Sequence, residues 1–316
     1  MILVVSSPQD VHVQAVGPEL DALGADWRVV DLSTFPARLT LTADVEGDGV
    51  DQRLVGPDVG DVALSDCEAV WWRRPQPFGL DTVGLDGNDY AFAYSETQAA
   101  FDGLWSSLED VRWVNDPVRD LEAHRKLYGL QVARSVGLEV PRTRVTNDPD
   151  EARAFVDEEG VSSTVYKAFT ATEQSWRETR VLRPTELQYL EATRLAPVIF
   201  QEYVPADVDL RVTVVDEEVF PAAIYSQETE YPFDFRMTMD AARMEADELP
   251  DDVVEKLHAF MDRLGLVYGA IDMRRTPDGR HVFLEVNPAG QFLFVEERTG
   301  QPISAALARA LAGGGD

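Results

Sequence analysis

Cysteine and histidine are scarce in this chain, which limits the kinds of site that it can form. Cys67 is the single cysteine among 316 residues, and this excludes a disulfide framework and a cysteine-bound metal cluster. The four histidines are scattered without the spacing of metal ligands. No window approaches the roughly 18 apolar residues that a membrane span needs, and the opening MILVVSSPQD has no basic flank. We therefore expect a cytoplasmic protein with no membrane partner.

Basic residues are also few compared with acidic ones, at 28 against 57. The formal net charge is -29, and no basic stripe is available to neutralise phosphates, so we expect no nucleic-acid partner. A disordered acidic chain would explain the charge, but 45% hydrophobic residues and 9% aromatics argue against it. The acidity is therefore a property of a folded protein's surface.

Lysine is rarer still than arginine. Of the 28 basic residues, 25 are arginine, and the lysines are Lys126, Lys167 and Lys256. An acidic surface repels itself in dilute buffer, whereas at molar salt the Debye length falls to about 3 Å and screens that repulsion. This composition favours a halophilic protein from a salt-rich cytoplasm. The alternative is an arginine-biased genome that encodes a merely acidic protein.

The first third of the chain has the pattern of a small α/β domain. A chain of this length exceeds one ordinary core, so two or three subdomains are expected. The segments MILVV, VHVQAVGPELDALGA and WRVVDL predict a strand, a helix and a strand on a parallel sheet. The segment CEAVWWRR predicts a further strand, and residues 90–108 predict an amphipathic helix. We place this domain at residues 1–115.

The rest of the chain predicts two α+β subdomains, at residues 116–200 and 201–316. The first contains one long helix from Pro117 to Gly137, the strand LEVPRTRVT, a helix over about residues 149–158 and the strand TVYKAF. The second contains the strands DLRVTVV and VFPAAIYS, a helix near residues 250–264 and a closing pair of strands. No internal repeat is present.

The closing pair, YGAIDMRR and HVFLEVN, predicts an antiparallel hairpin around the turn TPDG. If Thr276 lies opposite Gly279, Asp272 lies opposite Phe283 and is a diagonal neighbour of Glu285. Asn287 follows on the same face. These three oxygen-bearing side chains suit a hard divalent ion such as Mg²⁺. A solvated polar face of an edge hairpin explains them equally well.

Two of the lysines are candidates for contacts with phosphate. Lys126 lies on the long predicted helix, and Lys167 lies between apolar neighbours in VYKAF. A compact ammonium group is preferred over guanidinium near many phosphate sites. The alternative is that both are ordinary lysines whose stems pack on apolar surface.

The segment FQEYVPADVDLRVTVV offers a third set of candidates. The main chain of Gln201, Glu202, Tyr203 and Val204 could pair with an adenine edge. Asp209 and Arg211 share one face of the next strand, where Arg211 suits a γ-phosphate or a substrate carboxylate. A cross-strand ion pair explains Asp209 and Arg211 equally well.

The order of Lys126, VYKAF, QEYV, DLR, IDMRR and FLEVNP resembles the ATP-grasp carboxylate ligases over nearly the whole chain. Within them, WWRRP and LEVNPAGQFLFVEERTGQPIS are similar to the graspetide, or microviridin-type, maturases that crosslink side chains of ribosomal peptides. Glutamate-adding relatives usually carry serine and glycine after the metal-binding asparagine, where this chain has PAGQF. The resemblance implies a Rossmann-like pre-ATP-grasp domain followed by two α+β subdomains that enclose a nucleotide.

The resemblance also implies roles for the candidate residues. ATP would be bound by Lys126 and Lys167 at the phosphates and by QEYV at the adenine, with Asp209 nearby. One or two Mg²⁺ ions, with Mn²⁺ as the alternative, would be held by Asp272, Glu285 and Asn287. Arg211 and Arg274 would face the transferred phosphoryl group or the substrate acid. One departure is that the hydroxyl-rich loop at residues 170–176 lacks the glycines with which many ATP-grasp enzymes cover the phosphates.

The implied activity is an ATP-dependent ligase that joins a carboxylate to an amine or alcohol through an acylphosphate. The substrate would be a precursor peptide or another carboxylate. The candidates for admitting it past the acidic surface are Arg73 and Arg74, with Arg211, Arg274 and Arg275, and the tryptophans of WWRRP would pack against the peptide. Two alternative functions stay open: a ligase that adds a free amino acid such as glutamate, and a non-catalytic ATP-binding regulator. The protein could also assemble as a homodimer. The alternative for WWRRP is that it is simply the end of a strand, whose arginines pair with surface acids.

Overall fold

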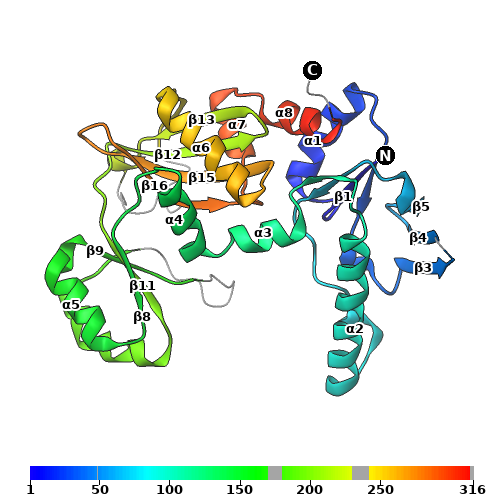
Figure 1. Ribbon diagram of the computed structural model, residues 1–316, viewed down its shortest axis with the longest axis horizontal. Helices are drawn as coiled ribbons and strands as arrows, with labels where there is room; N and C mark the ends of the chain where they lie inside the picture. The colour runs from blue at the N-terminus through cyan, green and yellow to red at the C-terminus, as the bar shows by residue number, and fades with distance from the viewer. Residues whose placement is uncertain (48, 170–179, 230–241, 314–316) are drawn as a thin grey trace.

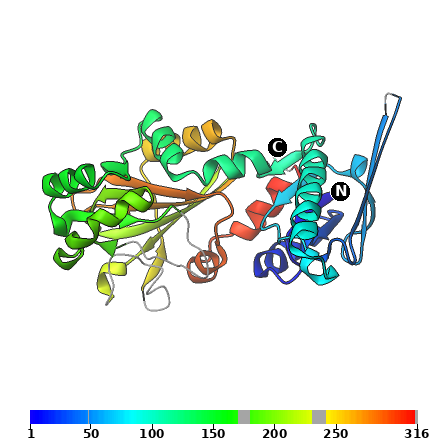
Figure 2. The same cartoon turned by 90° about the horizontal axis from the view of Figure 1, so that it is seen from below.

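The computed structural model describes residues 1–47, 49–169, 180–229 and 242–313. Figure 1 shows a parallel sheet near the N-terminus at one end of the molecule, and two further sheets toward the other end. The long axis of the molecule is clearest in Figure 2, where the hairpin of β3 (Thr40–Glu46) and β4 (Gly49–Gly56) projects beyond the N-terminal sheet. Within the described ranges, no helix is both long and apolar enough to cross a membrane.

The N-terminal sheet is parallel and has the order β2-β1-β6-β7. Its strands are β1 (Ile2–Val5), β2 (Trp27–Val30), β6 (Ala69–Trp72) and β7 (Arg112–Val114). One face packs on α1 (Val11–Ala22) and the other on α2 (Gly87–Ser106), which explains the near-continuous apolar character of the strands. The predicted strand–helix–strand unit is therefore confirmed.

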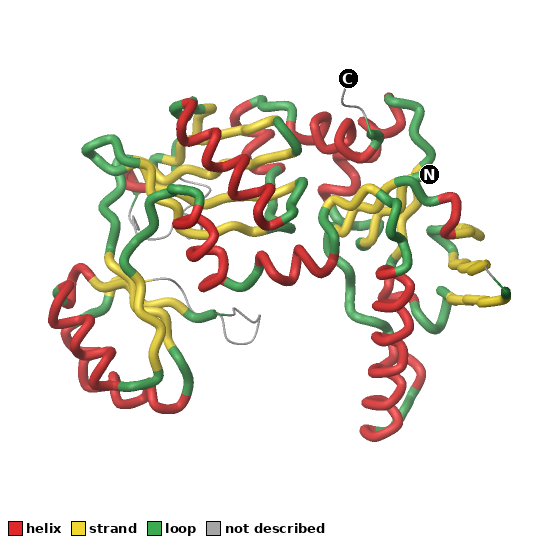
Figure 3. The backbone as a smooth tube through the Cα atoms, viewed as in Figure 1, coloured by secondary structure: helices red, strands yellow, loops and turns green. Residues whose placement is uncertain are grey.

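A second, antiparallel sheet at this end was not predicted. It consists of β3 (Thr40–Glu46), β4 (Gly49–Gly56) and β5 (Gly60–Ala63), drawn as yellow tubes in Figure 3. Most of its side chains are exposed, with few apolar residues turned inward, such as Leu54. The apolar alternation that reveals a half-buried strand is correspondingly weak here.

The predicted long helix is wrong in one respect, because it is two helices. Residues Pro117–Ala123 form α3 and residues Lys126–Ser135 form α4, and Arg125 between them has an extended backbone with ψ of 93°. Asp116 caps α3 through the N–H groups of Val118 and Arg119, and Pro117 occupies the first turn. The break makes Lys126 the first residue of a helix that packs against β16.

The central sheet has the order β10-β9-β11-β8 and is antiparallel. Its strands are β8 (Thr143–Thr146), β9 (Thr164–Lys167), β10 (Arg180–Val181) and β11 (Val198–Glu202). One face packs on α5 (Pro149–Glu159) and on the 3₁₀ segment η5 (Pro184–Leu195), through Phe155, Leu190 and Phe200. The opposite face therefore carries the alternate residues, which include Lys167 and Gln201.

The C-terminal sheet has the order β14-β13-β12-β15-β16. Its strands are β12 (Val208–Val215), β13 (Glu218–Ile224), β14 (Met244–Ala246), β15 (Tyr268–Arg275) and β16 (His281–Asn287). One face packs on α4 and on the strongly amphipathic α6 (Asp251–Leu264) through Leu257, Phe260 and Phe283. The other face carries a row of polar side chains, and α7 (Leu293–Thr299) follows β16 beside β14.

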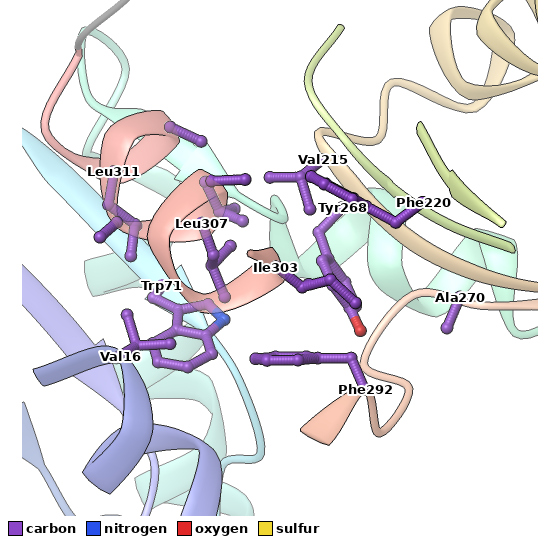
Figure 4. Packing of buried hydrophobic residues seen from close by; sticks show 14 of the residues in the cluster. Val16, Trp71, Val215, Phe220, Tyr268, Ala270, Phe292, Ile303, Leu307 and Leu311 are labelled. Atoms are coloured by element: carbon purple, nitrogen blue, oxygen red, sulfur yellow. The ribbon is translucent and has the colours of Figure 1, made fainter. Parts of the chain in front are cut away.

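The last helix, α8 (Ile303–Leu311), packs against both the N-terminal domain and the C-terminal sheet. Figure 4 shows Leu307 and Leu311 beside Val16 and Trp71 of the N-terminal domain. The same buried cluster contains Val215 of the C-terminal sheet and further residues of both ends. A continuous core therefore joins the N-terminal domain to the sheet that carries the polar row.

The register of the closing hairpin differs from the predicted one in two places. Thr276 lies opposite Arg280, because Gly279 adopts a φ of +86° and closes a three-residue loop. A bulge at Leu284 then shifts the pairing again, so Asp272 lies directly opposite Glu285. The three-residue loop thus sets Phe283 opposite Met273 on the apolar face, and the bulge that follows returns Glu285 to the face of Asp272.

Candidate active site

A row of polar side chains crosses the middle of the C-terminal sheet on the face away from α6. The register pairs Arg211 of β12 with Asp272 of β15, and Asp272 with Glu285 of β16. One step further along, Ala270 lies opposite Asn287. The predicted set of Asp272, Glu285 and Asn287 therefore lies on one face, with Asp272 and Glu285 as direct rather than diagonal neighbours.

Arg211 is held in a buried position within this row. Its Nη1 donates to Asp272 Oδ1 at 2.8 Å, and its Nη2 donates to the carbonyl oxygen of Gln291 at 2.9 Å. The guanidinium also lies 5.9 Å from the ring centroid of Phe294. An arginine held by three groups keeps a fixed orientation. Such a guanidinium can stabilise negative charge that develops at one position during a reaction.

Asp209 and Arg274 form a second buried pair in the same sheet. Arg274 Nε donates to Asp209 Oδ1 at 2.8 Å, and Ser226 donates to the other carboxylate oxygen. Arg274 Nη1 donates to the carbonyl of Val204 at 2.7 Å, and the guanidinium lies 5.4 Å from the Tyr203 ring centroid. These contacts make Arg274 a support for the QEYV segment, and Asp209 the anion that orients Arg274.

The QEYV segment lines a small pocket between the two sheets. Lys167, Arg180, Leu284 and the segment itself surround a volume of about 40 Å³. Glu202 N–H donates to the Arg142 carbonyl, and Tyr203 N–H donates to the Ser163 carbonyl. These two N–H groups serve the protein backbone, so any pairing with a base depends on the other main-chain groups of the segment.

Lys126 lies at the β16 edge of the polar row, beside Glu285. Its Nζ is 3.5 Å from Glu285 Oε2 and donates to the carbonyl of Ala168 at 3.2 Å. A pocket of about 410 Å³ is lined by Lys126, Phe169, Glu285 and Asn287, among others. The structure thus brings together the predicted lysine and two of the predicted metal ligands. The hydroxyl-rich loop at residues 170–176 lies outside the described residues.

The oxygen set of Asp272, Glu285 and Asn287 fits a hard cation with incomplete protein ligation. Among the described residues, no group of three or more His, Cys, Asp or Glu side chains could hold a metal ion. A magnesium ion bound here would therefore use two carboxylates and one amide, with phosphate or water completing the shell, which is its usual mode. Arg211 and Lys126 lie against these carboxylates, at the contacts given above.

The two arginines of WWRRP differ in their surroundings. Arg73 is 2% exposed, and its Nη1 donates to the carbonyls of Ala289 and Gly290. Arg74 is exposed. The expected contact of the tryptophans with a peptide is wrong for Trp71, which is buried in the core. Trp72 is half-buried and packs edge to face on other tryptophans, and its contact with a peptide stays a prediction. Arg275, the remaining arginine candidate, forms an ion pair with Asp247.

Several residues of this region were missed by the sequence reasoning. Asn115 is buried, and its Nδ2 donates to the carbonyls of Tyr268 and Pro288 at 2.8 and 3.0 Å. His12 Nε2 accepts from Phe292 N–H at 3.3 Å. Asn115 directly follows a parallel strand, and functional groups commonly lie at the carboxyl ends of such strands. Its position in the sequence could therefore have marked it as a candidate residue.

A further pocket has a different setting. It has a volume of about 750 Å³ and is lined by Tyr166, Arg180, Glu186, Tyr189 and neighbouring residues. It lies between η5, which carries Glu186 and Tyr189, and the face of the central sheet that packs on η5. It is therefore separate from the polar row.

Comparison with known proteins agrees with this arrangement. Residues 1–120 match the family model of the MvdD pre-ATP grasp domain, and residues 123–311 match that of the RimK-like ATP-grasp domain. A comparison with curated protein sequences finds no match.

Solved structures of similar proteins cover almost the whole chain. The macrocyclase MdnC from Microcystis aeruginosa MRC, bound with its precursor peptide MdnA, is 29% identical with a TM-score of 0.87, covering 99% of each chain. A RiPP-associated ATP-grasp ligase of Chryseobacterium gregarium, in complex with ADP and a leader and core peptide, is 26% identical with a TM-score of 0.91, covering 100% of this chain and 97% of its own. The ATP-grasp ligase PsnB, complexed with a minimal precursor, Mg and ADP, is 28% identical with a TM-score of 0.81, covering 99% of this chain and 96% of its own.

The resemblance inferred from the sequence is thereby confirmed at the level of fold and family. The order of sheets, the polar row and the family match over residues 123–311 agree with one another. The chain belongs to the RimK-like ATP-grasp family, with a pre-ATP-grasp domain at its N-terminus.

Proposed function

We propose that this protein is an ATP-dependent ligase that forms ester or amide crosslinks between side chains of a ribosomal precursor peptide. The observation that carries the proposal is the polar row of Arg211, Asp272, Glu285 and Asn287, which lies beside Lys126 and the QEYV pocket. The three related structures named above hold a precursor peptide or leader and core peptides, and two of those three also hold ADP. We also propose a cytoplasmic location and units at residues 1–115, 116–200 and 201–316.

The nucleotide would span the two pockets that lie beside the polar row. The adenine would pair with main-chain groups of the Gln201–Glu202–Tyr203–Val204 segment, which Arg274 supports from behind. Lys167 at the end of β9 and Lys126 at the start of α4 would bind the phosphates. Magnesium would be held by Asp272, Glu285 and Asn287, and when bound it neutralises charge on the phosphate oxygens.

The reaction follows from this arrangement in two steps. An Asp or Glu carboxylate of the peptide attacks the γ-phosphorus in line, the bond to the β-phosphate oxygen breaks, and an acylphosphate and ADP form. Arg211 faces the transferred phosphoryl group and stabilises its charge. A Ser or Thr hydroxyl, or a Lys amine, of the same peptide then attacks the acyl carbon. It loses its proton to solvent and displaces phosphate, so each bond costs one ATP and removes one water from the peptide.

The substrate must be acidic, and the protein is acidic too. Local positive charge at the entrance is therefore needed, and exposed Arg74, next to the buried Arg73, is our candidate for it. Arg74→Ala should impair peptide modification far more than nucleotide binding. Arg211→Ala should stop ADP release itself. If both variants had equally mild effects on peptide modification and on ADP release, neither arginine would have the role proposed for it.

The metal site gives the sharpest test of the proposal. Glu285→Gln should abolish Mg²⁺-dependent ADP release while leaving the melting temperature nearly unchanged, because the amide keeps the shape of the side chain. Glu139→Gln is the matched control, since Glu139 is an exposed glutamate that pairs with Arg280 beside the same strand. Near-normal turnover of Glu285→Gln at limiting Mg²⁺ would show that the site is wrongly assigned.

A further inference from the structure

The loop that follows Asn287 is irregular, yet its backbone is held almost entirely by side chains. The carbonyl of Pro288 accepts from Asn115, and those of Ala289 and Gly290 accept from Arg73. Gly290 also accepts from Tyr268 Oη at 2.7 Å. Further along the loop, the carbonyl of Gln291 accepts from Arg211, and Phe292 N–H donates to His12. Buried backbone groups outside helices and sheets need such partners, and here they come from residues far away in sequence.

The loop is also packed tightly against the sheet. A Cβ added to Gly290 would lie 2.4 Å from the Cβ of Ala270 and 2.8 Å from Arg211 Nη2. The glycine therefore lets the loop backbone lie directly on β15 and on Arg211. A displacement of this loop would move Arg211, because the Gln291 carbonyl is one of its two hydrogen-bond acceptors in the polar row.

The loop is coupled to Asn287 as well. Asn287 Oδ1 accepts from Ala289 N–H at 3.2 Å, and the Asn287 carbonyl accepts from Gly290 N–H at 3.2 Å. The orientation of the Asn287 side chain thus depends on where Ala289 lies. Arg73 binds the carbonyls of Ala289 and Gly290, the same two residues whose N–H groups contact Asn287.

Arg73 is itself fixed from the N-terminal side. Its Nε lies 3.4 Å from Asp10 Oδ2, and the Asp10 carboxylate accepts from the backbone N–H of His12 at 2.8 Å. Burial raises the pKa of Asp10, but the hydrogen bond from His12 and the charge of Arg73 outweigh it and hold that pKa well below its usual range. Asp10 therefore stays an anion, and it also caps α1.

We propose that Arg73 is a positioning residue: held by Asp10, it fixes the 288–292 loop and thereby orients Asn287 and Arg211 in the polar row. This inference rests on the proposed function of that row. It assigns Arg73 a role other than direct contact with the peptide, and it makes the N-terminal domain a structural part of the metal and phosphate site. Loss of a partner that holds a metal ligand in place typically costs about 10–100-fold in metal affinity or activity.

The test compares variants that loosen the loop with one that loosens only the contact between domains. Arg73→Met removes the two loop bonds, and Tyr268→Phe removes a third with almost no change of shape. Arg112→Met is the matched control, because Arg112 also crosses between domains, to the carbonyl of Ala310 and to Asp216, without reaching the loop. The readouts are the gain in ADP affinity on adding Mg²⁺, deuterium uptake of a fragment covering residues 287–295, and the melting temperature.

We expect Arg73→Met to reduce the Mg²⁺-dependent gain in ADP affinity by about 10-fold and to raise uptake in the loop fragment. Tyr268→Phe should change both in the same direction by less, and it serves as the decisive variant if Arg73→Met does not fold. Arg112→Met should lower only the melting temperature. If the loop variants behaved like Arg112→Met, the inference would be overturned while the proposed function stood. If the wild-type protein showed no gain with Mg²⁺, the proposed function would fail and the inference with it.

Discussion

The buried pair of Arg274 and Asp209 allows a quantitative prediction that separates a supporting role from a catalytic one. Arg274→Met removes the guanidinium and leaves the Asp209 carboxylate, which is 3% exposed, with Ser226 as a remaining hydrogen-bond donor. Removing one partner of a buried ion pair costs about 3–5 kcal/mol, because the other charge stays buried. For a domain the size of residues 123–311, about 1 kcal/mol corresponds to about 2–4 °C, so the melting temperature should fall by about 6–20 °C.

The same variant should weaken nucleotide binding, because the Val204 carbonyl and the Tyr203 ring lose their support. Melting would be followed by circular dichroism, and ADP affinity by calorimetry. Arg280→Met is the control: Arg280 lies on the same hairpin, is half exposed and pairs with Asp278 and Glu139 at the surface, so its loss should cost less than about 1 kcal/mol. A double variant, Arg274→Met with Asp209→Asn, should recover part of the lost stability, because no charge is left unpaired. If Arg274→Met melted like Arg280→Met but lost turnover, Arg274 would be catalytic and the supporting role would be wrong.

Three further predictions concern the nucleotide, salt and pH. Lys167→Arg should weaken ATP binding in a titration although the charge is kept, because a guanidinium directs its donors differently; unchanged affinity would make Lys167 an ordinary surface charge. The melting temperature should rise steeply from dilute to molar KCl as repulsion within the acidic surface is screened, and a flat profile would exclude salt adaptation. Burial lowers the pKa of His12, so as the pH falls the unfolded chain protonates this imidazole before the folded protein does. The free energy of unfolding should therefore decrease below about pH 6.5. His12→Gln should make the stability less dependent on pH in that range, and an unchanged pH dependence would refute the assignment.

Much of the fold could be predicted from the sequence, because most elements follow their apolar periodicity. The parallel N-terminal strands, α5 and α6 appear close to their expected bounds, since each buries one regular face. The β3–β5 sheet was missed because its strands bury few side chains. The long helix was predicted across His124 and Arg125 because no proline or glycine marks the break there.

The candidate site was predictable in its chemistry but not in its detail. The alternation of Glu285 and Asn287 was enough to place them on one face, whereas the bulge at Leu284 that sets Asp272 opposite Glu285 has no local signal. The environment of Arg73 could not be predicted either. Its partners Ala289 and Gly290 lie more than 200 residues away, so an arginine next to tryptophans looked like an exposed strand end. The boundaries at residues 115 and 200 and the roles of the individual site residues stay predictions.

The central claim is tested most directly by counting ADP released and water lost in one reaction. The wild-type protein is incubated with ATP, Mg²⁺ and candidate precursor peptides that contain Asp or Glu together with Ser, Thr or Lys, and the peptide is analysed by mass spectrometry. We predict one ADP released for each water lost, with fragmentation blocked across the crosslinked segment, and neither product with Glu285→Gln. A gain of mass that matches an added amino acid, or ADP release without any change in the peptide, would contradict the account.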